Sequence, residues 1–210
     1  MIVVDVETTG TDPARHAIIS IGAIDLAQPT RQFYRECRIW EGAQVQQEAL
    51  DINGFTHEQV TDPARSSAEE VIGAFVAFCR EVKDRTLGGH NTSFDRNFLQ
   101  AAVDRHNLFW QFGRRVLDLH SFGWMHMAKT GHDIPSRGGR SDLSCDAILK
   151  YAGLPPEPQP HNGLMGAKME AEAFSRLIYG KGLLEEFAAH EIPEHFRGIP
   201  ARPDDQIALL

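Results

Sequence analysis

Three absences narrow the class of protein that this sequence encodes. Cysteine is scarce among the 210 residues, and Cys37, Cys79 and Cys145 stand far apart without any CxxC pair. This odd number predicts neither a disulfide framework nor a zinc site, and it fits a reducing compartment. No segment approaches the roughly 18 uninterrupted apolar residues of a membrane span, and no basic leader precedes the first apolar run. We therefore expect a cytoplasmic protein without a membrane partner.

An excess of positive charge is also missing. The chain carries 29 acidic residues against 21 lysines and arginines, a formal net charge of -8. Proteins that hold long nucleic acids by charge are usually basic overall. If this protein handles nucleic acid, we expect it to hold a short stretch locally.

The apolar pattern predicts an α/β fold. With 42% hydrophobic residues, the chain can bury one sizeable core. Apolar β-branched runs predict strands, whereas three- and four-residue apolar spacing predicts helices. The expected strands cover residues 2–6, 17–26, 32–39 and a short run near 86–87. The expected helices begin at Ser66 and then cover 94–106, 116–127, 144–151 and 167–179. Strands first, followed by strands mixed with helices, indicate a layered α/β domain.

Acidic residues stand at two of the predicted element ends. Asp5 and Glu7 are two residues apart on the first strand, so both project from one face. Asp95 opens a predicted helix directly after a strand and the turn Gly88-Gly89. Oxygen ligands of this kind suit Mg²⁺ or Mn²⁺. Taken singly, the pair on the strand is more typical of solvated acids, and Asp95 is equally typical of an acid favoured by the helix dipole.

A histidine completes this set of polar residues. His161 follows Pro158 and Pro160 and precedes a predicted helix. The positive end of that helix would favour a neutral imidazole, which is able to accept a proton. With ten histidines in the chain, a surface position is the alternative interpretation.

These motifs occur in a fixed order that resembles a known family. DxETTG near the N-terminus, GHNxSFD about ninety residues later and PxPHN before a late helix are similar to the DnaQ-like DEDDh 3′–5′ exonucleases, which include proofreading exonucleases, RNase T and oligoribonuclease. The resemblance extends over about residues 2–179 and implies a ribonuclease H-like fold, in which a mixed five-stranded sheet is flanked by helices. It places an exonuclease domain in residues 1–180. Residues 181–210 are expected to form a C-terminal helix and a loose tail.

The resemblance also implies roles for individual residues. Asp5, Glu7 and Asp95 would hold two divalent cations, Mg²⁺ or Mn²⁺, and His161 would remove a proton from the attacking water. The substrate would be the 3′ end of a single-stranded nucleic acid. The positions implied to bind it are Thr8, Thr9, Ile52, Asn53, Asn91 and Phe94. Stacking of an apolar side chain on a base tolerates any sequence.

One expected ligand is missing. Members of the family carry an aspartate five residues after the histidine, and this position is Gly166 here. Either the substitution, natural or introduced, weakens catalysis severely, or another residue completes the site. Glu170 lies one turn further on the same helical face, although a solvated charge is the simpler interpretation, and Glu172 lies on a different face. Restored activity in Gly166→Asp would identify a damaged site.

Three other features have weaker interpretations. His120, His126 and His132 recur every six residues and do not share a helical face, so we expect no zinc site there. The stretch from Lys129 to Arg140 is locally basic and suits either phosphate contacts or a solvated loop. The segment 206–210, from Gln206 to Leu210, resembles the short peptides that dock on bacterial sliding clamps.

Two functions from different classes therefore remain open. The first is a metal-dependent 3′–5′ exonuclease that releases nucleoside monophosphates from single-stranded DNA or short RNA, impaired at Gly166. The second is a non-catalytic nucleic-acid-binding module, and a proofreading subunit of a replication complex is a further variant. The sequence selects neither DNA nor RNA and gives no oligomeric state.

Overall fold

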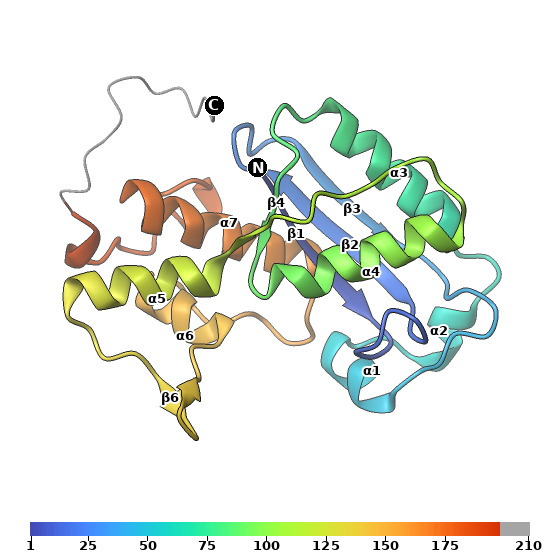
Figure 1. Cartoon of the computed structure of the whole chain (residues 1–210), viewed down its shortest axis with the longest axis horizontal. Coiled ribbons are helices and arrows are strands. Elements are labelled where there is room, and N and C mark those ends of the chain that lie inside the picture. The colour runs from blue at the N-terminus through green and yellow to red at the C-terminus, as the bar shows by residue number, and fades with distance from the viewer. Residues whose placement is uncertain (198–210) are drawn as a thin grey trace.

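The sheet at the centre of the molecule is built from the apolar runs that open the sequence. In the computed structural model, which describes residues 1–197, the strand order is β3-β2-β1-β4-β5 (Figure 1). The strands are β1 (Ile2–Thr8), β2 (Ile18–Asp25), β3 (Gln32–Glu36), β4 (Leu87–Gly89) and β5 (Leu117–Asp118). The first three strands form an antiparallel meander, whereas β4 and β5 run parallel to β1. The expected mixed five-stranded sheet is confirmed.

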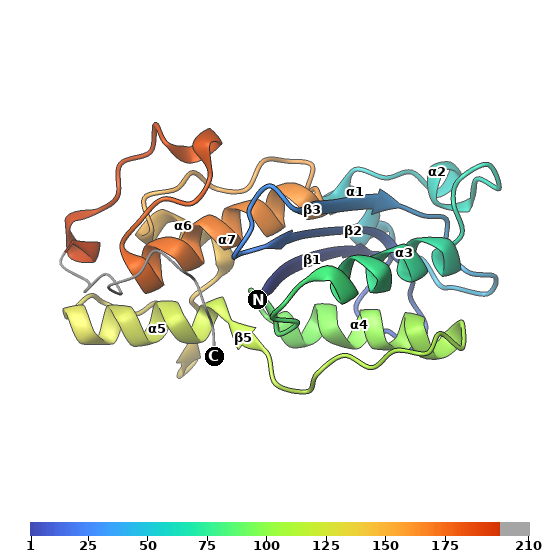
Figure 2. The same cartoon turned by 90° about the horizontal axis from the view of Figure 1, so that it is seen from above.

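Seven α-helices flank this sheet within residues 1–197. They are α1 (Gln47–Asn53), α2 (His57–Thr61), α3 (Ala68–Glu81), α4 (Thr92–Arg105), α5 (Leu119–Thr130), α6 (Cys145–Tyr151) and α7 (Gly163–Tyr179). Figure 2 shows α3 and α4 on one face of the sheet and α7 on the other. Every residue of β2 is buried because both faces are covered. Ile2, Val4 and Val6 join the core under α3 and α4, whereas Val3 points to the other face of β1 and joins the core under α5, α6 and α7.

Local sequence signals explain where the two long helices begin. The Ser67 hydroxyl accepts a hydrogen bond from Glu70 N–H, and the Glu70 side chain accepts one from Ser67 N–H, which forms a capping box at the start of α3. At the start of α7, the Asn162 side chain accepts hydrogen bonds from Leu164 N–H and Met165 N–H. This cap starts α7 at Gly163 rather than near residue 167. The two glycines in its first turn hide that start from apolar periodicity.

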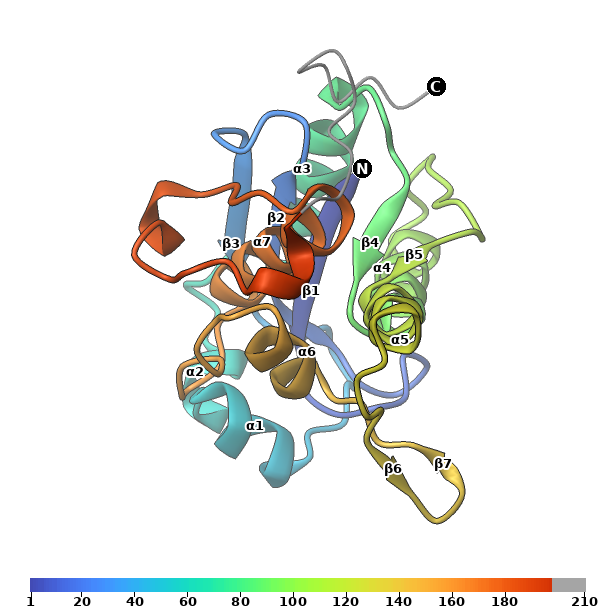
Figure 3. The same ribbon diagram turned by 90° about the vertical axis from the view of Figure 1, so that its left-hand side faces the viewer.

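The described part of the C-terminal segment differs from the expected helix. Residues 181–197 contain two short 3-10 helices, η1 (Glu185–Phe187) and η2 (Glu194–Phe196), that pack under α7. A small hairpin of β6 (Ser136–Arg137) and β7 (Arg140–Ser141) projects from the domain near α5 (Figure 3). Across residues 1–197, no helix combines the length and the apolar character that crossing a bilayer requires.

A buried ion pair on α7 leads to a prediction about stability. The Arg176 guanidinium lies 2.8 Å from Glu172 Oε1, both side chains are fully buried, and Arg176 also donates to five backbone carbonyls. We expect Arg176→Met to lower the free energy of unfolding by about 3–5 kcal/mol, because it leaves Glu172 buried without its partner. Urea unfolding measures this loss. Lys168→Met, which breaks the partly exposed pair with Glu186, is the matched control and should cost less than about 1 kcal/mol. An equal loss of unfolding free energy in the two variants would contradict the stabilising role of the buried pair between Arg176 and Glu172.

Candidate active site

Three of the expected acids meet at the end of β1. Asp5 and Glu7 project from the face of β1 that α7 covers, and a β-bulge follows Glu7. The Val6 N–H between them donates a 3.0 Å hydrogen bond to Asp95 Oδ1 in the first turn of α4. Asp95 is only 4% exposed. This hydrogen bond fastens the start of α4 to the strand, and it explains why an acid ninety positions away in sequence reaches the pair on β1.

Close packing of α7 on the sheet brings Gly166 against Asp5. A Cβ placed on Gly22 would lie 2.0 Å from the Gly163 carbonyl carbon, so the helix touches the strand backbone to backbone. A Cβ placed on Gly166 would lie 2.0 Å from Asp5 Oδ2. The space of a side chain at position 166 is therefore already filled by the Asp5 carboxylate. The position is buried beside the Asp5 and Glu157 carboxylates, but as a glycine it carries no ligand of its own.

His161 enters the same cluster with an acid that the sequence analysis did not single out. The Glu157 Oε2 atom lies 3.8 Å from His161 Nδ1, and Glu157 Oε1 lies 3.2 Å from the Cβ position at Gly166. Ligand atoms of Glu7, Glu157 and His161 all lie within 4.8 Å of one another. The His161 side chain is 31% exposed, so water reaches it. Glu157 belongs to a proline-rich loop without periodicity, and that explains why no sequence signal marked it.

The structure corrects the simpler interpretation of Glu170. Its carboxyl is not solvated: it is 7% exposed and accepts a 3.1 Å hydrogen bond from His90 N–H after β4. Cys145 Sγ lies 3.7 Å from the same oxygen. Glu170 is therefore the second additional acid of the cluster. Glu172 points away into the pair with Arg176.

Burial and like charge raise the pKa values of these carboxyl groups. Burial raises the pKa of Glu7 to about 7, with Glu157 adding to the effect. Burial also raises the pKa of Asp95 to about 8, although hydrogen bonds from backbone N–H groups oppose the rise. The pKa of Asp5 is raised well above its ordinary value by burial, followed by repulsion from Glu170, Glu7, Asp95 and Glu157. Five carboxyl groups that disfavour each other's ionisation need a positive partner before all can be charged.

The donor set fits a divalent cation. Among the ion pairs of residues 1–197, none places a lysine or arginine against these five acids, and His161 is the basic residue that contacts one of them. Glu157 Oε1 and Glu170 Oε2 are buried oxygens without a hydrogen-bond partner within the described chain. Carboxylate oxygens are the ligands that Mg²⁺ and Mn²⁺ prefer. A divalent cation would satisfy the unpaired oxygens and offset the repulsion.

Three of the expected substrate positions support the loops around the cluster. The Thr8 hydroxyl donates to Gly10 O at 2.7 Å, and the Thr9 hydroxyl donates to Gln44 O at 2.7 Å. Asn53 Nδ2 donates to Thr8 O at 3.1 Å. These side chains are buried and hydrogen-bonded within the protein. The backbone of Thr9 is engaged as well, because its N–H donates to Ala17 O and its carbonyl accepts from Gln46 N–H.

The other three substrate positions lie at the rim. Ile52 is 51% exposed at the end of α1, and its carbonyl accepts a hydrogen bond from His161 N–H at 3.1 Å. Phe94 is partly buried against Phe98, with ring centroids 4.8 Å apart. Asn91 caps α4 with φ of 56° in the left-handed region, which asparagine tolerates. The hydrogen bond between His161 N–H and the Ile52 carbonyl thus joins α1 to the segment that carries His161.

The remaining sequence features lie apart from this cluster. His126 and His132 pack with Tyr151 and His195 around η2, and the three-residue metal groups of the described chain do not include them. The basic stretch forms the exposed hairpin β6–β7, where Arg137 pairs with Asp142 at 2.9 Å. The clamp-like segment 206–210 lies outside the described residues.

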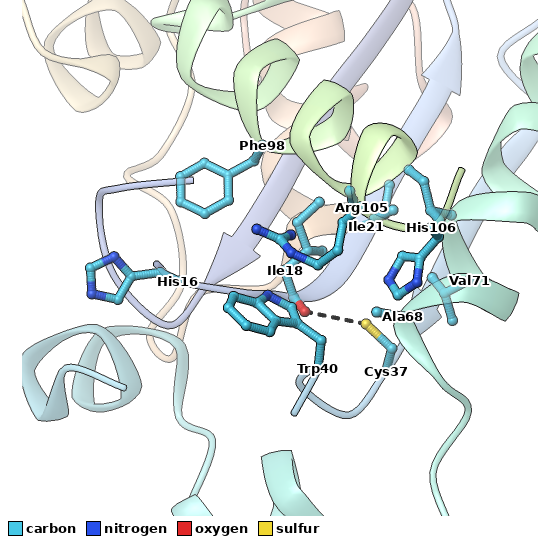
Figure 4. Close-up of a pocket in the computed structure, with 12 residues that line it drawn as sticks. His16, Ile18, Ile21, Cys37, Trp40, Ala68, Val71, Phe98, Arg105 and His106 are labelled. Atoms are coloured by element: carbon cyan, nitrogen blue, oxygen red, sulfur yellow. Dashed lines mark hydrogen bonds between the residues drawn. The ribbon is translucent and has the colours of Figure 1, made fainter. Parts of the chain in front are cut away.

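A small cavity on the opposite face of the sheet is too narrow for a nucleotide. It measures about 10 Å³ and lies among β2, α3 and α4, with Trp40 and Arg105 on its wall (Figure 4). Such a volume holds about one water molecule. Trp40 Nε1 and His106 Nε2 line it and have no hydrogen-bond partner within residues 1–197. The cavity therefore does not compete with the acid cluster as a substrate site.

Comparisons with known proteins show which family the chain belongs to. The RNase_T family model, described as an exonuclease, matches residues 2–174. Ribonuclease T of Marinobacter nauticus is 34% identical over 195 residues, which cover 84% of this chain and 81% of that protein. The PolC-type DNA polymerase III of Thermotoga maritima is 28% identical over 178 residues, and the chain spans only 12% of its length.

Solved structures share the fold. The nuclease domain of 3′hExo, a DEDDh family member bound to rAMP, superposes with a TM-score of 0.64 at 18% identity, covering 92% of this chain and 95% of that domain. E. coli Exonuclease I in complex with a 5cy-dT13 oligonucleotide superposes with a TM-score of 0.61 at 18% identity. That alignment covers 84% of this chain and 39% of Exonuclease I. These likenesses confirm the ribonuclease H-like architecture.

Proposed function

Because the chain belongs to the RNase T exonuclease family, we propose that it is a metal-dependent 3′–5′ exonuclease that releases nucleoside monophosphates from single-stranded DNA or short RNA. The observation that carries this proposal is the meeting of Asp5, Glu7, Asp95 and His161 in one cluster, although they come from three distant parts of the chain. Carboxylates and a partly exposed imidazole at one point suit hydrolysis of a phosphodiester.

Each residue has a defined task in this proposal. Asp5, Glu7 and Asp95 would hold the divalent cations, Mg²⁺ or Mn²⁺. When bound, these ions polarise the scissile phosphate and offset the charge that develops on the leaving 3′-oxygen. His161 would accept the proton of the attacking water, and the Glu157 carboxylate lies 3.8 Å from its Nδ1.

The rim would hold the terminal nucleotide without reading its sequence. The turn that begins at Thr8 and Thr9 would lie beside its phosphate and sugar, while Ile52 and Phe94 would flank its base. Apolar contact with a base face does not distinguish one base from another. Asn53 and Asn91 would position the loops on either side. We therefore expect little sequence preference and leave the choice between DNA and RNA to the assay.

Related proteins support both kinds of polymer. The relatives include a ribonuclease T and a PolC-type DNA polymerase III, and the structural neighbours hold an oligothymidylate and rAMP. A specific observation, Gly166, favours a second candidate, a nucleic-acid-binding module that keeps the fold of the site without turnover. Docking of the segment 206–210 on a sliding clamp, as in a proofreading subunit, remains a separate proposal that co-elution with a bacterial clamp tests.

The decisive assay uses 5′-labelled single-stranded oligomers of DNA and RNA with Mn²⁺. We expect a ladder that shortens from the 3′ end, together with mononucleotides. A circular single strand, which has no end, should stay intact and thus controls for endonuclease activity. Binding of the oligomer without any shortening in Mn²⁺ or Mg²⁺ would establish the binding module instead. Absence of both binding and cleavage would reject the proposal.

A further inference from the structure

The acid cluster contains two carboxylates beyond its three expected ligands, and one of them, Glu157, lies beside the position where the family residue is missing. We propose that Glu157 is the carboxylate that completes the cation site in place of an acid at position 166. This inference rests on the proposed function, because it assigns a ligand to that same site. The sequence left two explanations of Gly166: a substitution that weakens catalysis, or a site that another residue completes. This inference selects the second.

The geometry of the Glu157 carboxylate supports this assignment. Its Oε1 atom lies 3.2 Å from the point that a Cβ at position 166 would occupy, and Asp5 Oδ2 lies 2.0 Å from that same point. Its Oε2 atom faces His161 Nδ1 at 3.8 Å. Its ligand atoms also belong to the group with Glu7 and His161 that spans at most 4.8 Å. A single carboxylate thus faces the strand acids, the histidine and the place of the missing aspartate.

The hydrogen bonding of Glu157 leaves one oxygen free for a ligand. The side chain is 13% exposed, and Oε1 is fully buried without a partner among residues 1–197. A buried acceptor without a donor is costly, so a structural role for this oxygen is unfavourable. The backbone N–H of Glu157 donates to Asp146 Oδ1 at 3.3 Å and fixes the loop beneath the cluster. The carboxylate is therefore held in place while one of its oxygens has no protein partner.

Glu170 is the competing assignment, because it too is buried and close to Asp5. Its Oε1 atom, however, accepts the His90 N–H and the Cys145 thiol, and its Oε2 atom lies 3.2 Å from the Cβ position of Gly89. These contacts direct Glu170 toward the turn after β4. It shares no compact three-residue group with the other acids of residues 1–197. Glu157 is therefore the better replacement.

The test measures Mn²⁺ binding to the full chain, using the electron paramagnetic resonance signal of free Mn²⁺ during titration. We expect Glu157→Gln to weaken binding at least about tenfold, the range in which altered outer partners of metals already act. Asp146→Asn is the matched control, because it removes one charge next to the loop while its side-chain oxygen still accepts the Glu157 N–H. This control should change affinity less than about twofold.

Two further measurements separate ligation from a structural role. Glu157→Gln removes a like charge, so its metal-free Tm at pH 8 should equal or exceed that of the unaltered chain. A lower metal-free Tm together with weaker Mn²⁺ binding would show that the side chain only supports the loop and would overturn the assignment. Gly166→Asp should bring no gain in Mn²⁺ affinity, because its Cβ would displace the Asp5 carboxylate. A tenfold gain would overturn the assignment as well.

The remaining outcomes distinguish this inference from the function on which it rests. If Glu7→Gln weakens Mn²⁺ binding while Glu157→Gln leaves it unchanged, only the Glu157 assignment fails and the proposed exonuclease site stands. If Glu170→Gln weakens binding in its place, Glu170 is the replacement ligand and the assignment fails. If the unaltered chain binds no Mn²⁺ at all, the metal site of the proposed function fails together with it.

Discussion

Asp5→Asn should reduce release of mononucleotides at least about 100-fold while it raises the metal-free Tm at pH 8. Asn is nearly isosteric with Asp, so the packing of α7 on β1 at Gly166 is preserved. The substitution removes the charge at the centre of the cluster, which Glu170, Glu7, Asp95 and Glu157 all repel. Loss of an inner ligand should cost at least as much as the 10- to 100-fold typical of an outer partner. Activity and stability therefore change in opposite directions.

The measurement combines initial rates on a labelled single strand with thermal unfolding in EDTA. Asp25→Asn is the matched control, since Asp25 is a buried acid on β2 whose Oδ1 accepts the Ala27 N–H, a role that Asn can keep. This control should change the rate less than about twofold. Retained activity in Asp5→Asn would remove β1 from the metal site. A lower metal-free Tm would show that the repulsion assigned to Asp5 is not present in the folded protein.

The parts of the fold that apolar patterning specifies could be predicted from sequence. β1 and β2 follow runs rich in β-branched residues, β3 carries Phe33 and Tyr34 after a turn signal, and α3 follows a capping box and an apolar face. The fifth strand, Leu117–Asp118, consists of two residues joined directly to a helix. In the sequence these two residues fall within the apolar spacing of that helix. Only the resemblance to the DEDDh exonucleases therefore implied a fifth strand. The short helices α1 and α2 carry too few apolar residues for a periodic signal.

The site could be predicted as far as the motifs extend. Asp5, Glu7, Asp95 and His161 stand in recognisable segments, whereas Glu157 stands in a loop of alternating prolines. Its proximity to Gly166 depends on how closely α7 approaches the sheet at Gly22 and Gly163. That approach is a tertiary contact between residues far apart in sequence, and no local propensity encodes it. The burial of Glu170 has the same origin, because the turn after β4 covers it.

The metal-free protein should lose stability as the pH rises from 6.5 to 8.0, and Mn²⁺ should abolish this loss. Glu7 and Asp95 ionise in the folded state at about 7 and about 8, against ordinary values of 4.5 and 3.8. Between the ordinary pKa and the raised pKa of each group, the carboxyl is ionised in the unfolded chain and protonated in the folded chain. The unfolded chain therefore holds fewer protons, and the free energy of unfolding falls as the pH rises. Each carboxyl that stays protonated in the folded state lowers the free energy of unfolding by about 1.4 kcal/mol per pH unit. Asp5 and Glu170, whose pKa values are raised well above normal, act in the same direction.

The chosen pH range isolates the carboxyl groups from other titrating side chains. Burial lowers the pKa values of His90, His106 and His126, so their effect lies mainly below pH 6.5 and has the opposite sign. Burial raises the pKa values of Cys37 and Cys79 to about 12, so their effect begins near the ordinary thiol range above pH 8. Within the window, a loss on the order of 3 kcal/mol corresponds to a fall in Tm of roughly 10 °C.

Thermal unfolding at matched ionic strength, with EDTA or with Mn²⁺, checks this expectation. Mn²⁺ would bind the ionised carboxylates of the folded state, and at about 100 times its Kd it would add about 2.7 kcal/mol to the free energy of unfolding. Because protons compete for the same oxygens, the stabilisation should be larger at pH 8.0 than at pH 6.5. Asp95→Asn should flatten the metal-free pH profile, since it removes a carboxyl that takes up a proton in this range. A metal-free Tm that stays constant or rises between these two pH values would mean that the acids do not repel one another as the packing of β1, α4 and α7 requires.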